Sequence, residues 1–238
     1  MKNLKDLPDS VEQALNESHL SPRFVCGPMK IKLTKDLMIH LTEVTEREIA
    51  DVKNRKNLNS DVIVRAFDSI GSFSVYHRVN QEFKDFLKAC AVKYAELLDI
   101  KELLEGRGST APFGSQNKER GEIKITGIWG ISNREYDYNP VHWHYGKLSG
   151  VIYIKVPEQI IDGTREKEFG IAKQHGVADG KLEIIYGSSW PFAFHSVGNA
   201  KICPIEGNMY LFPAWLLHTV YPFKGEGERR IVSFNLDW

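Results

Sequence analysis

The sequence of 238 residues lacks several features that mark particular classes of protein. Its 31 lysines and arginines balance 31 aspartates and glutamates, so the net charge does not indicate a nucleic-acid or membrane partner. It contains no run of about 18 apolar residues, and its N-terminus has no apolar signal-peptide core. We therefore expect a cytoplasmic protein that acts on a small molecule or a peptide, in an oligomeric state that the sequence does not determine.

Cysteines and nucleophile motifs are also scarce. The three cysteines, Cys26, Cys90 and Cys203, are scattered and form no Cys-x-x-Cys pair. This pattern fits neither a disulfide framework nor a thiolate zinc site, and we expect the three to be small buried hydrophobic residues. The sequence has no Gly-x-Ser-x-Gly elbow, so hydrolysis by a serine nucleophile has little support.

The length of the chain fits a single domain whose first half differs from its second. Apolar residues recur at three- and four-residue spacings over 35–53 and 81–105, which predicts a helix in each segment. A shorter helix is expected over 9–17. Residues 1–120 are therefore predicted to form a mostly helical support region.

Short segments rich in Ile, Val, Tyr and Phe follow over residues 121–238, separated by Gly, Pro, Asn and Asp. The segments are 122–132, 149–156, 181–186, 200–203, 208–212 and 229–236. This arrangement predicts a mainly β fold, an all-β sandwich or barrel with flanking α-helices outside it. The polar, glycine-containing stretch 158–180 is expected to be a long loop or lid.

Two histidines on alternate positions, His142 and His144, precede the apolar segment at 149–156. In extended backbone the two-residue period points both side chains to one face, where their nitrogens can meet a single metal ion. The alternative is a pair of polar side chains on a solvated strand face. A third ligand has to come from elsewhere, and His218, which follows a buried-looking strand, is the candidate; its alternative role is capping or packing near Trp215.

The last predicted strand begins with two arginines, Arg229 and Arg230. Alternation places them on opposite faces, so one arginine faces inward if the strand is covered on one side. A buried guanidinium group needs an anionic partner. A ligand that carries a carboxylate would supply that partner.

These residues and their surroundings resemble the 2-oxoglutarate- and Fe(II)-dependent oxygenases, within a branch that has an H-x-H metal motif. The matching motifs are, in order, His142-Trp-His144, Leu148 to Tyr153, Gly180-Lys-Leu182, Pro204-Ile-Glu-Gly207, Phe212-Pro-Ala-Trp-Leu-Leu-His218 and Arg229 to Asn235. Order and spacing agree over roughly residues 125–236, whereas the first 120 residues add nothing to the resemblance. The ordered set makes the resemblance specific, because no single motif would suffice.

The resemblance implies a double-stranded β-helix, the cupin-like jelly roll, with residues 121–238 as its catalytic core. It implies Fe(II) as cofactor and 2-oxoglutarate as co-substrate, which O₂ oxidises and decarboxylates to succinate. Carried over by position, His142 and His218 are catalytic metal ligands, and Arg229 binds the distal carboxylate of 2-oxoglutarate. Arg229 is preferred over Arg230 because its step to Asn235 matches the family strand. Tyr153 falls where related enzymes place a hydroxyl group near that carboxylate, with barrel packing as its alternative role.

His144 departs from the family pattern, because most members have a carboxylate at this position. We favour His144 as the third metal ligand. A carboxylate such as Asp137 from the preceding loop is the second possibility, and a centre with only two strong ligands is the third. His195 is a further candidate if the strand register differs by one motif.

The function predicted is that of an oxygenase that hydroxylates a small molecule or an amino-acid side chain. One alternative is a cupin-like metal- or ligand-binding protein without redox chemistry, since a fold does not fix a function. Another is a three-histidine dioxygenase that needs no keto acid. Arg229 separates these possibilities, because only the keto-acid enzyme requires an inward-facing cation there.

Overall fold

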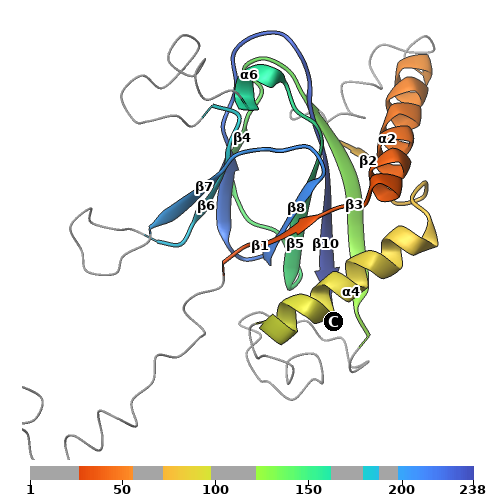
Figure 1. Cartoon of the computed structure of the whole chain (residues 1–238), viewed down its shortest axis with the longest axis vertical. Coiled ribbons are helices and arrows are strands. Elements are labelled where there is room, and N and C mark those ends of the chain that lie inside the picture. The colour runs from red at the N-terminus through yellow and green to blue at the C-terminus, as the bar shows by residue number, and fades with distance from the viewer. Residues whose placement is uncertain (1–26, 56–71, 98–121, 162–178, 188–197) are drawn as a thin grey trace, which may run out of the picture.

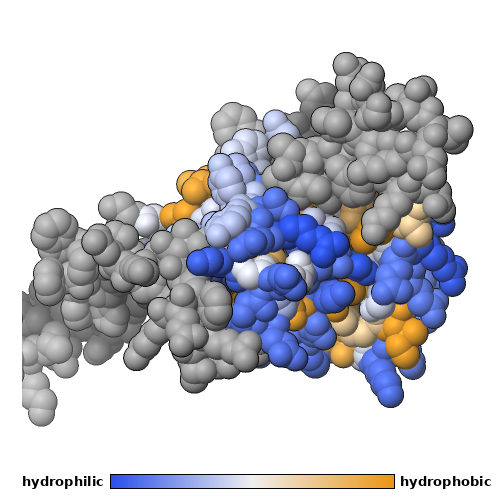
Figure 2. Space-filling model, turned by 90° about the horizontal axis from the view of Figure 1, so that it is seen from above, coloured by the Kyte–Doolittle hydropathy of each residue, from blue (hydrophilic) through white to orange (hydrophobic). Residues whose placement is uncertain are grey.

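The computed structural model describes residues 27–55, 72–97, 122–161, 179–187 and 198–238 (Figure 1). None of the helices within these ranges has the length and apolar character needed to cross a membrane. Seen from above, the described part of the surface is mainly hydrophilic, with apolar residues in small separate groups (Figure 2).

Two antiparallel sheets form the centre of the molecule. The larger sheet has the order β1-β8-β5-β10-β3-β2 and the smaller has the order β4-β9-β6-β7. The strands of the larger sheet are β1 (Met29–Lys32), β2 (Ser72–Ser74), β3 (Lys124–Asn133), β5 (Leu148–Lys155), β8 (Asn208–Pro213) and β10 (Arg229–Asp237). Those of the smaller sheet are β4 (Asn139–His142), β6 (Leu182–Ile185), β7 (Asn199–Ile202) and β9 (Leu217–Val220).

The two sheets face each other across a common apolar core. Ile131, Tyr153 and Phe212 from the larger sheet belong to one buried cluster with Leu182 and Ile184 from the smaller sheet. Antiparallel strands that close over a shared interior in this way form the double-stranded β-helix, or jelly roll. The fold is therefore mainly β with flanking helices, as predicted.

Helices cover the outer face of the larger sheet (Figure 1). Helix α2 (Lys35–Arg55) begins after Thr34, whose Oγ1 accepts the N–H of Leu37 at 3.3 Å. Helix α4 (Gln81–Leu97) begins after Asn80, whose Oδ1 accepts the N–H of Phe83 at 2.9 Å. Such N-caps satisfy N–H groups that the first turn of a helix leaves without a partner.

A second buried cluster lies between these helices and the sheet. Leu41 of α2 and Phe83 and Leu87 of α4 pack with Val232 and Phe234 of β10, and all five are fully buried. Strand β10 is thus buried on both faces, with even-numbered residues towards the helices and odd-numbered residues towards the jelly-roll interior. This alternation decides what each of the two arginines at its start can contact.

Gly150 of β5 permits a close approach within the second cluster. A Cβ atom at this position would lie 2.2 Å from Cζ of Phe234, much closer than packed atoms allow. Glycine at this position therefore lets the Phe234 ring lie directly against the backbone of the neighbouring strand.

Several predicted boundaries differ from those observed. The helix predicted over 81–105 is described as far as Leu97, and residues 98–105 lie outside the described residues. The stretch 158–180, predicted as a loop, begins with a short helix, α6 (Glu158–Ile161). Strands β1, β2, β4 and β9 were not predicted as strands. The predicted helix 9–17, Cys26 and His195 lie outside the described residues, while Cys90 is buried as expected and Cys203 is partly exposed.

Candidate metal centre and 2-oxoglutarate pocket

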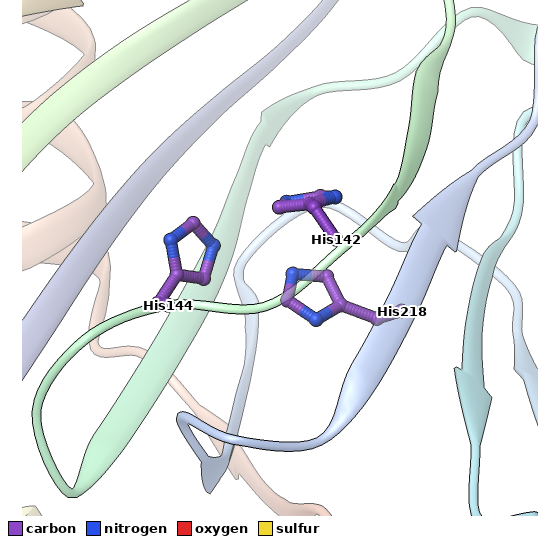
Figure 3. Close-up of side chains that lie close together, drawn as sticks. All are labelled: His142, His144 and His218. Atoms are coloured by element: carbon purple, nitrogen blue, oxygen red, sulfur yellow. The ribbon is translucent and has the colours of Figure 1, made fainter. Parts of the chain in front are cut away.

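The side chains of His142, His144 and His218 converge in the jelly roll (Figure 3). One ring nitrogen of each lies within 4.8 Å of the corresponding nitrogens of the other two. The ring centroids of His142 and His218 are 4.1 Å apart, and the His144 ring lies 5.0 Å from the first and 5.1 Å from the second. Ligand atoms in this arrangement could bind one metal ion.

Strand pairing in the smaller sheet brings two of these histidines together. His142 is the last residue of β4 and lies directly opposite His218 of β9 in the antiparallel register. Directly opposed residues of an antiparallel pair project from the same face of the sheet. His142 and His218 are therefore neighbours by backbone geometry alone.

His144 lies just beyond the end of β4. Its backbone N–H donates to the carbonyl of Ala214 at 2.9 Å, which ties this segment to the end of β8. Its ring contacts the indole of Trp129, with 5.5 Å between centroids. We had expected both His142 and His144 in extended backbone, and the short distance between their rings shows that they share a face although the strand has ended.

Backbone carbonyl groups orient two of the imidazole rings. Nδ1 of His218 lies 2.9 Å from the carbonyl of Leu216, and Nδ1 of His142 lies 2.7 Å from the carbonyl of Pro140. A carbonyl oxygen only accepts, so each Nδ1 must carry the proton and each Nε2 has a lone pair, which in His142 faces the Asn139 amide at 3.2 Å. This is how ligand histidines are usually held, with one nitrogen donating to the protein and the other facing the metal.

The environment keeps the His144 and His218 imidazoles neutral. Burial lowers the pKa of His218 to about 3, and it lowers the pKa of His144 to about 4, with a smaller contribution from the neighbouring His142. The positive form of each ring is disfavoured because it would lose hydration without gaining an anionic partner. Near neutral pH both rings therefore keep the lone pair that a metal requires.

Arg229 projects into the same cavity as the histidines and is 1% exposed. Its Nη1 donates to the carbonyls of Gly180 and Tyr221, and its Nη2 donates to Oδ1 of Asn133. All three acceptors are uncharged, and no carboxylate within the described residues forms a salt bridge with this guanidinium group. Burial lowers its pKa to about 10, so it remains positively charged at neutral pH.

Two donors of the Arg229 guanidinium group are left over. Of its five N–H bonds, three are used by the acceptors above, which leaves Nε–H and one N–H on Nη2. Nε is buried and has no hydrogen-bond partner among the described residues. Nε and Nη2 lie on one edge of the planar fork, the edge that can donate to both oxygens of a carboxylate.

Arg230 points the other way and is occupied by protein groups. Its Nε and Nη2 donate to the two carboxylate oxygens of Glu228, both at 2.8 Å, and Nη1 contacts Thr45 of helix α2 at 3.4 Å. Arg229 therefore faces the cavity, and Arg230 stabilises the contact between β10 and α2.

The cavity that contains these groups has a volume of about 410 Å³. Apolar walls come from Trp129, Ile131, Val151, Leu182, Phe212, Val220 and Ile231. Tyr153 also lines it and is almost fully buried; no described residue forms a hydrogen bond with its hydroxyl group. Burial raises the pKa of Tyr153, so its hydroxyl group keeps its proton and can donate.

One predicted alternative, Asp137, is not part of the cluster, and two cavity residues were not predicted. Asp137 is absent from the cavity lining, and its Oδ2 accepts the backbone N–H of Arg134 at 2.7 Å. His195 lies outside the described residues. Asn133, which binds Arg229, and Asn139, whose Nδ2 lies 3.2 Å from Nε2 of His142, line the cavity but were not singled out. Only their positions could have identified them. Asn133 ends β3, the strand paired with β10, and Asn139 lies three residues before His142.

The donor set fits a divalent transition metal. Neutral imidazole nitrogens suit iron, zinc, copper and nickel, whereas magnesium and calcium prefer oxygen ligands. A set of three protein ligands leaves coordination positions open for other molecules, as in catalytic metal centres. The residues present can thus hold iron beside a pocket for a carboxylate.

Comparison with known proteins agrees with this chemistry. Residues 127–235 match the family described as "Putative 2OG-Fe(II) oxygenase". A comparison with curated proteins gave no significant match.

Solved structures with similar folds have low sequence identity. AviO1 from Streptomyces viridochromogenes Tue57 is 15% identical, with 90% of each chain covered and a TM-score of 0.49. The viral collagen prolyl hydroxylase vCPH from Paramecium Bursaria Chlorella virus-1 is 14% identical, with 88% of this chain and 94% of that chain covered and a TM-score of 0.41. A 2OG-Fe(II) oxygenase family oxidoreductase from Burkholderia pseudomallei is 10% identical, with 67% of this chain and 57% of that chain covered and a TM-score of 0.36.

These structural similarities are too distant to carry an argument about function, so the assignment depends on the family match. That match spans the jelly roll from β3 to β10 and includes the three histidines and Arg229. Residues 127–235 of this chain are therefore similar to the 2OG-Fe(II) oxygenase family, whose enzymes depend on Fe(II) and 2-oxoglutarate.

Proposed function

We propose that this protein is a hydroxylase that acts on a small molecule or an amino-acid side chain and converts 2-oxoglutarate to succinate in the same reaction. His142, His144 and His218 bind the iron. Arg229 binds the distal carboxylate of 2-oxoglutarate, and Tyr153 donates a hydrogen bond to that carboxylate. The prime substrate enters the remaining space of the cavity.

One observation carries this proposal. A buried arginine with no anionic partner among the described residues lines the same cavity as three converging histidines. Burial of a lone charge is costly, so the fold tolerates Arg229 best if a ligand supplies the missing anion. A dicarboxylic acid that contacts both the metal and Arg229 satisfies this requirement.

The residues of the chain have separate tasks in the reaction. The carbonyls of Pro140 and Leu216 keep the histidine nitrogens pointed at the metal, and Asn133 holds the Arg229 fork in place. The apolar walls exclude water, which strengthens the electrostatic contact between Arg229 and the carboxylate. When bound, the iron supplies the oxidative chemistry that activates O₂ with 2-oxoglutarate.

The test is succinate formation by anaerobically purified protein that receives Fe(II), 2-oxoglutarate and then O₂. We expect slow succinate release without a prime substrate, and none from His218→Ala, which removes a buried ligand. Binding of Ni(II) and of 2-oxoglutarate, measured by calorimetry, accompanies the assay because turnover can require the prime substrate. Protein that binds the metal but not 2-oxoglutarate would contradict the proposal.

The three-histidine donor set also fits one other function, that of a dioxygenase without a keto acid. A dioxygenase that needs no keto acid would have the same ligands, because its oxidant does not derive from 2-oxoglutarate. Such an enzyme has no use for the free edge of Arg229. If O₂ uptake with a prime substrate proceeded equally well without 2-oxoglutarate, this alternative would replace our proposal.

A further inference from the structure

The cavity contains almost no negative charge. Among the described residues that line it, Arg229 is the one formally charged side chain, and neither an aspartate nor a glutamate is present. One acidic side chain, Asp137, interacts electrostatically with Arg229 from outside this lining, and its carboxylate already accepts an N–H. Glu183 and Glu228, which are also buried, are bonded to Tyr221 and Arg230.

The charges of the bound components leave an excess. A divalent metal and Arg229 together carry three positive charges, and 2-oxoglutarate carries two negative ones. Because all three proposed metal ligands are neutral imidazoles, no described residue that lines the cavity balances the remaining positive charge. A centre with a carboxylate in place of His144 would be neutral at the same stage.

A donor next to the metal also needs a new partner. The Asn139 Nδ2 atom lies 3.2 Å from Nε2 of His142, the nitrogen whose lone pair is free for a metal. Metal binding to Nε2 takes this acceptor away from the Asn139 amide. Asn139 lines the cavity and is partly exposed, so its amide can then donate to an acceptor on a ligand that binds beside the metal.

From these two observations we infer that the prime substrate is a monoanion, whose carboxylate binds beside the metal and accepts a hydrogen bond from Asn139. The inference rests on the proposed function, because it assumes that metal and 2-oxoglutarate are bound. The cavity volume of about 410 Å³ is at the small end of the range of roughly 300–1,000 Å³ for ligand pockets. With 2-oxoglutarate inside, the remaining space suits a small acid or the acidic end of a larger molecule.

Propionate and propionamide are suitable probes, because they have nearly the same shape and differ in charge. Calorimetry on Ni(II)-loaded protein with saturating 2-oxoglutarate measures both affinities without turnover. We expect propionate to bind at least tenfold more tightly than propionamide. The affinity for 2-oxoglutarate should change by less than threefold when propionate is present. This result shows that the two acids occupy different places.

Asn139→Asp places a negative charge beside the metal and cancels the excess positive charge of the loaded cavity. Its affinity for propionate should fall at least tenfold, whereas its affinity for propionamide should stay within threefold of wild type. Asn199→Asp is the matched control, because Asn199 is exposed on β7 and the substitution changes the net charge equally outside the cavity. Asn139→Ala keeps the excess charge and loses only the donor, so it should weaken propionate binding about fivefold.

Different failures have different meanings. If 2-oxoglutarate does not bind to the Ni(II)-loaded protein, the proposed function itself is wrong. If 2-oxoglutarate binds but the two probes bind equally, or propionate displaces 2-oxoglutarate, the inference of an anionic substrate is overturned and the proposed function stands. Equal loss of propionate binding in Asn139→Asp and Asn199→Asp would also overturn it.

Discussion

Replacement of Arg229 by methionine removes the buried positive charge and keeps a long, unbranched side chain. The wild-type guanidinium group has two free N–H bonds on one edge, at Nε and Nη2, after its three contacts with protein acceptors. Each charge-assisted hydrogen bond to a carboxylate contributes about 1.5–3 kcal/mol. Loss of both should therefore weaken 2-oxoglutarate binding by at least about 3 kcal/mol, or roughly a hundredfold.

Calorimetric titration of 2-oxoglutarate into Ni(II)-loaded protein measures this loss directly, and titration of Ni(II) into the metal-free variant shows whether the metal site is intact. The affinity for Ni(II) should change by less than about threefold, because Arg229 contacts none of the histidines. Arg230→Met is the matched control, since this neighbouring arginine pairs with Glu228 outside the cavity. It should lower the free energy of unfolding and leave 2-oxoglutarate affinity unchanged. If Arg229→Met bound 2-oxoglutarate within threefold of wild type, the assigned role of Arg229 would be wrong.

Three further predictions concern the cavity and its support. Tyr153→Phe should weaken 2-oxoglutarate binding about fivefold to tenfold and leave Ni(II) affinity unchanged, because burial keeps the hydroxyl group protonated as a donor. An unchanged calorimetric affinity for 2-oxoglutarate would assign Tyr153 to packing alone. The metal-free protein should lose stability as the pH falls from about 6.5 towards 3. The unfolded chain takes up protons on His144 and His218 in this range, whereas the folded protein binds them only near pH 4 and 3. Urea unfolding at pH 7 and 5.5 measures this loss of stability, and an equal pH dependence in His218→Gln would refute the prediction. Gly150→Ala should lower the free energy of unfolding by about 1–3 kcal/mol, because its Cβ would lie 2.2 Å from the Phe234 ring. Gly127→Ala should lower it less, because the nearest side-chain atom would lie 3.5 Å from its Cβ. Equal urea midpoints for the two variants would contradict the packing argument.

Local sequence patterns were sufficient to predict much of the molecule. The three-to-four-residue periodicity identified α2 and α4, and the β-branched segments identified β3, β5, β6, β7, β8 and β10 to within one or two residues. These patterns are informative because each element buries one face or both, and burial imposes its period on the sequence. Strands β1, β2, β4 and β9, which have three or four residues each, were not identified.

The sequence by itself also determined which residue types the site contains: two histidines one residue apart, a third histidine, and an arginine pair that opens a buried strand. Only the tertiary structure decided how they meet. The pairing of β4 with β9 places His142 opposite His218, and the pairing of β10 with β3 turns Arg229 towards Asn133 and the cavity while Arg230 faces α2. Pairing between distant strands depends on the whole core, and a shift by one residue would exchange the two faces of a strand. For that reason the local sequence could not distinguish Arg229 from Arg230, or identify Asn133 and Asn139 as cavity residues.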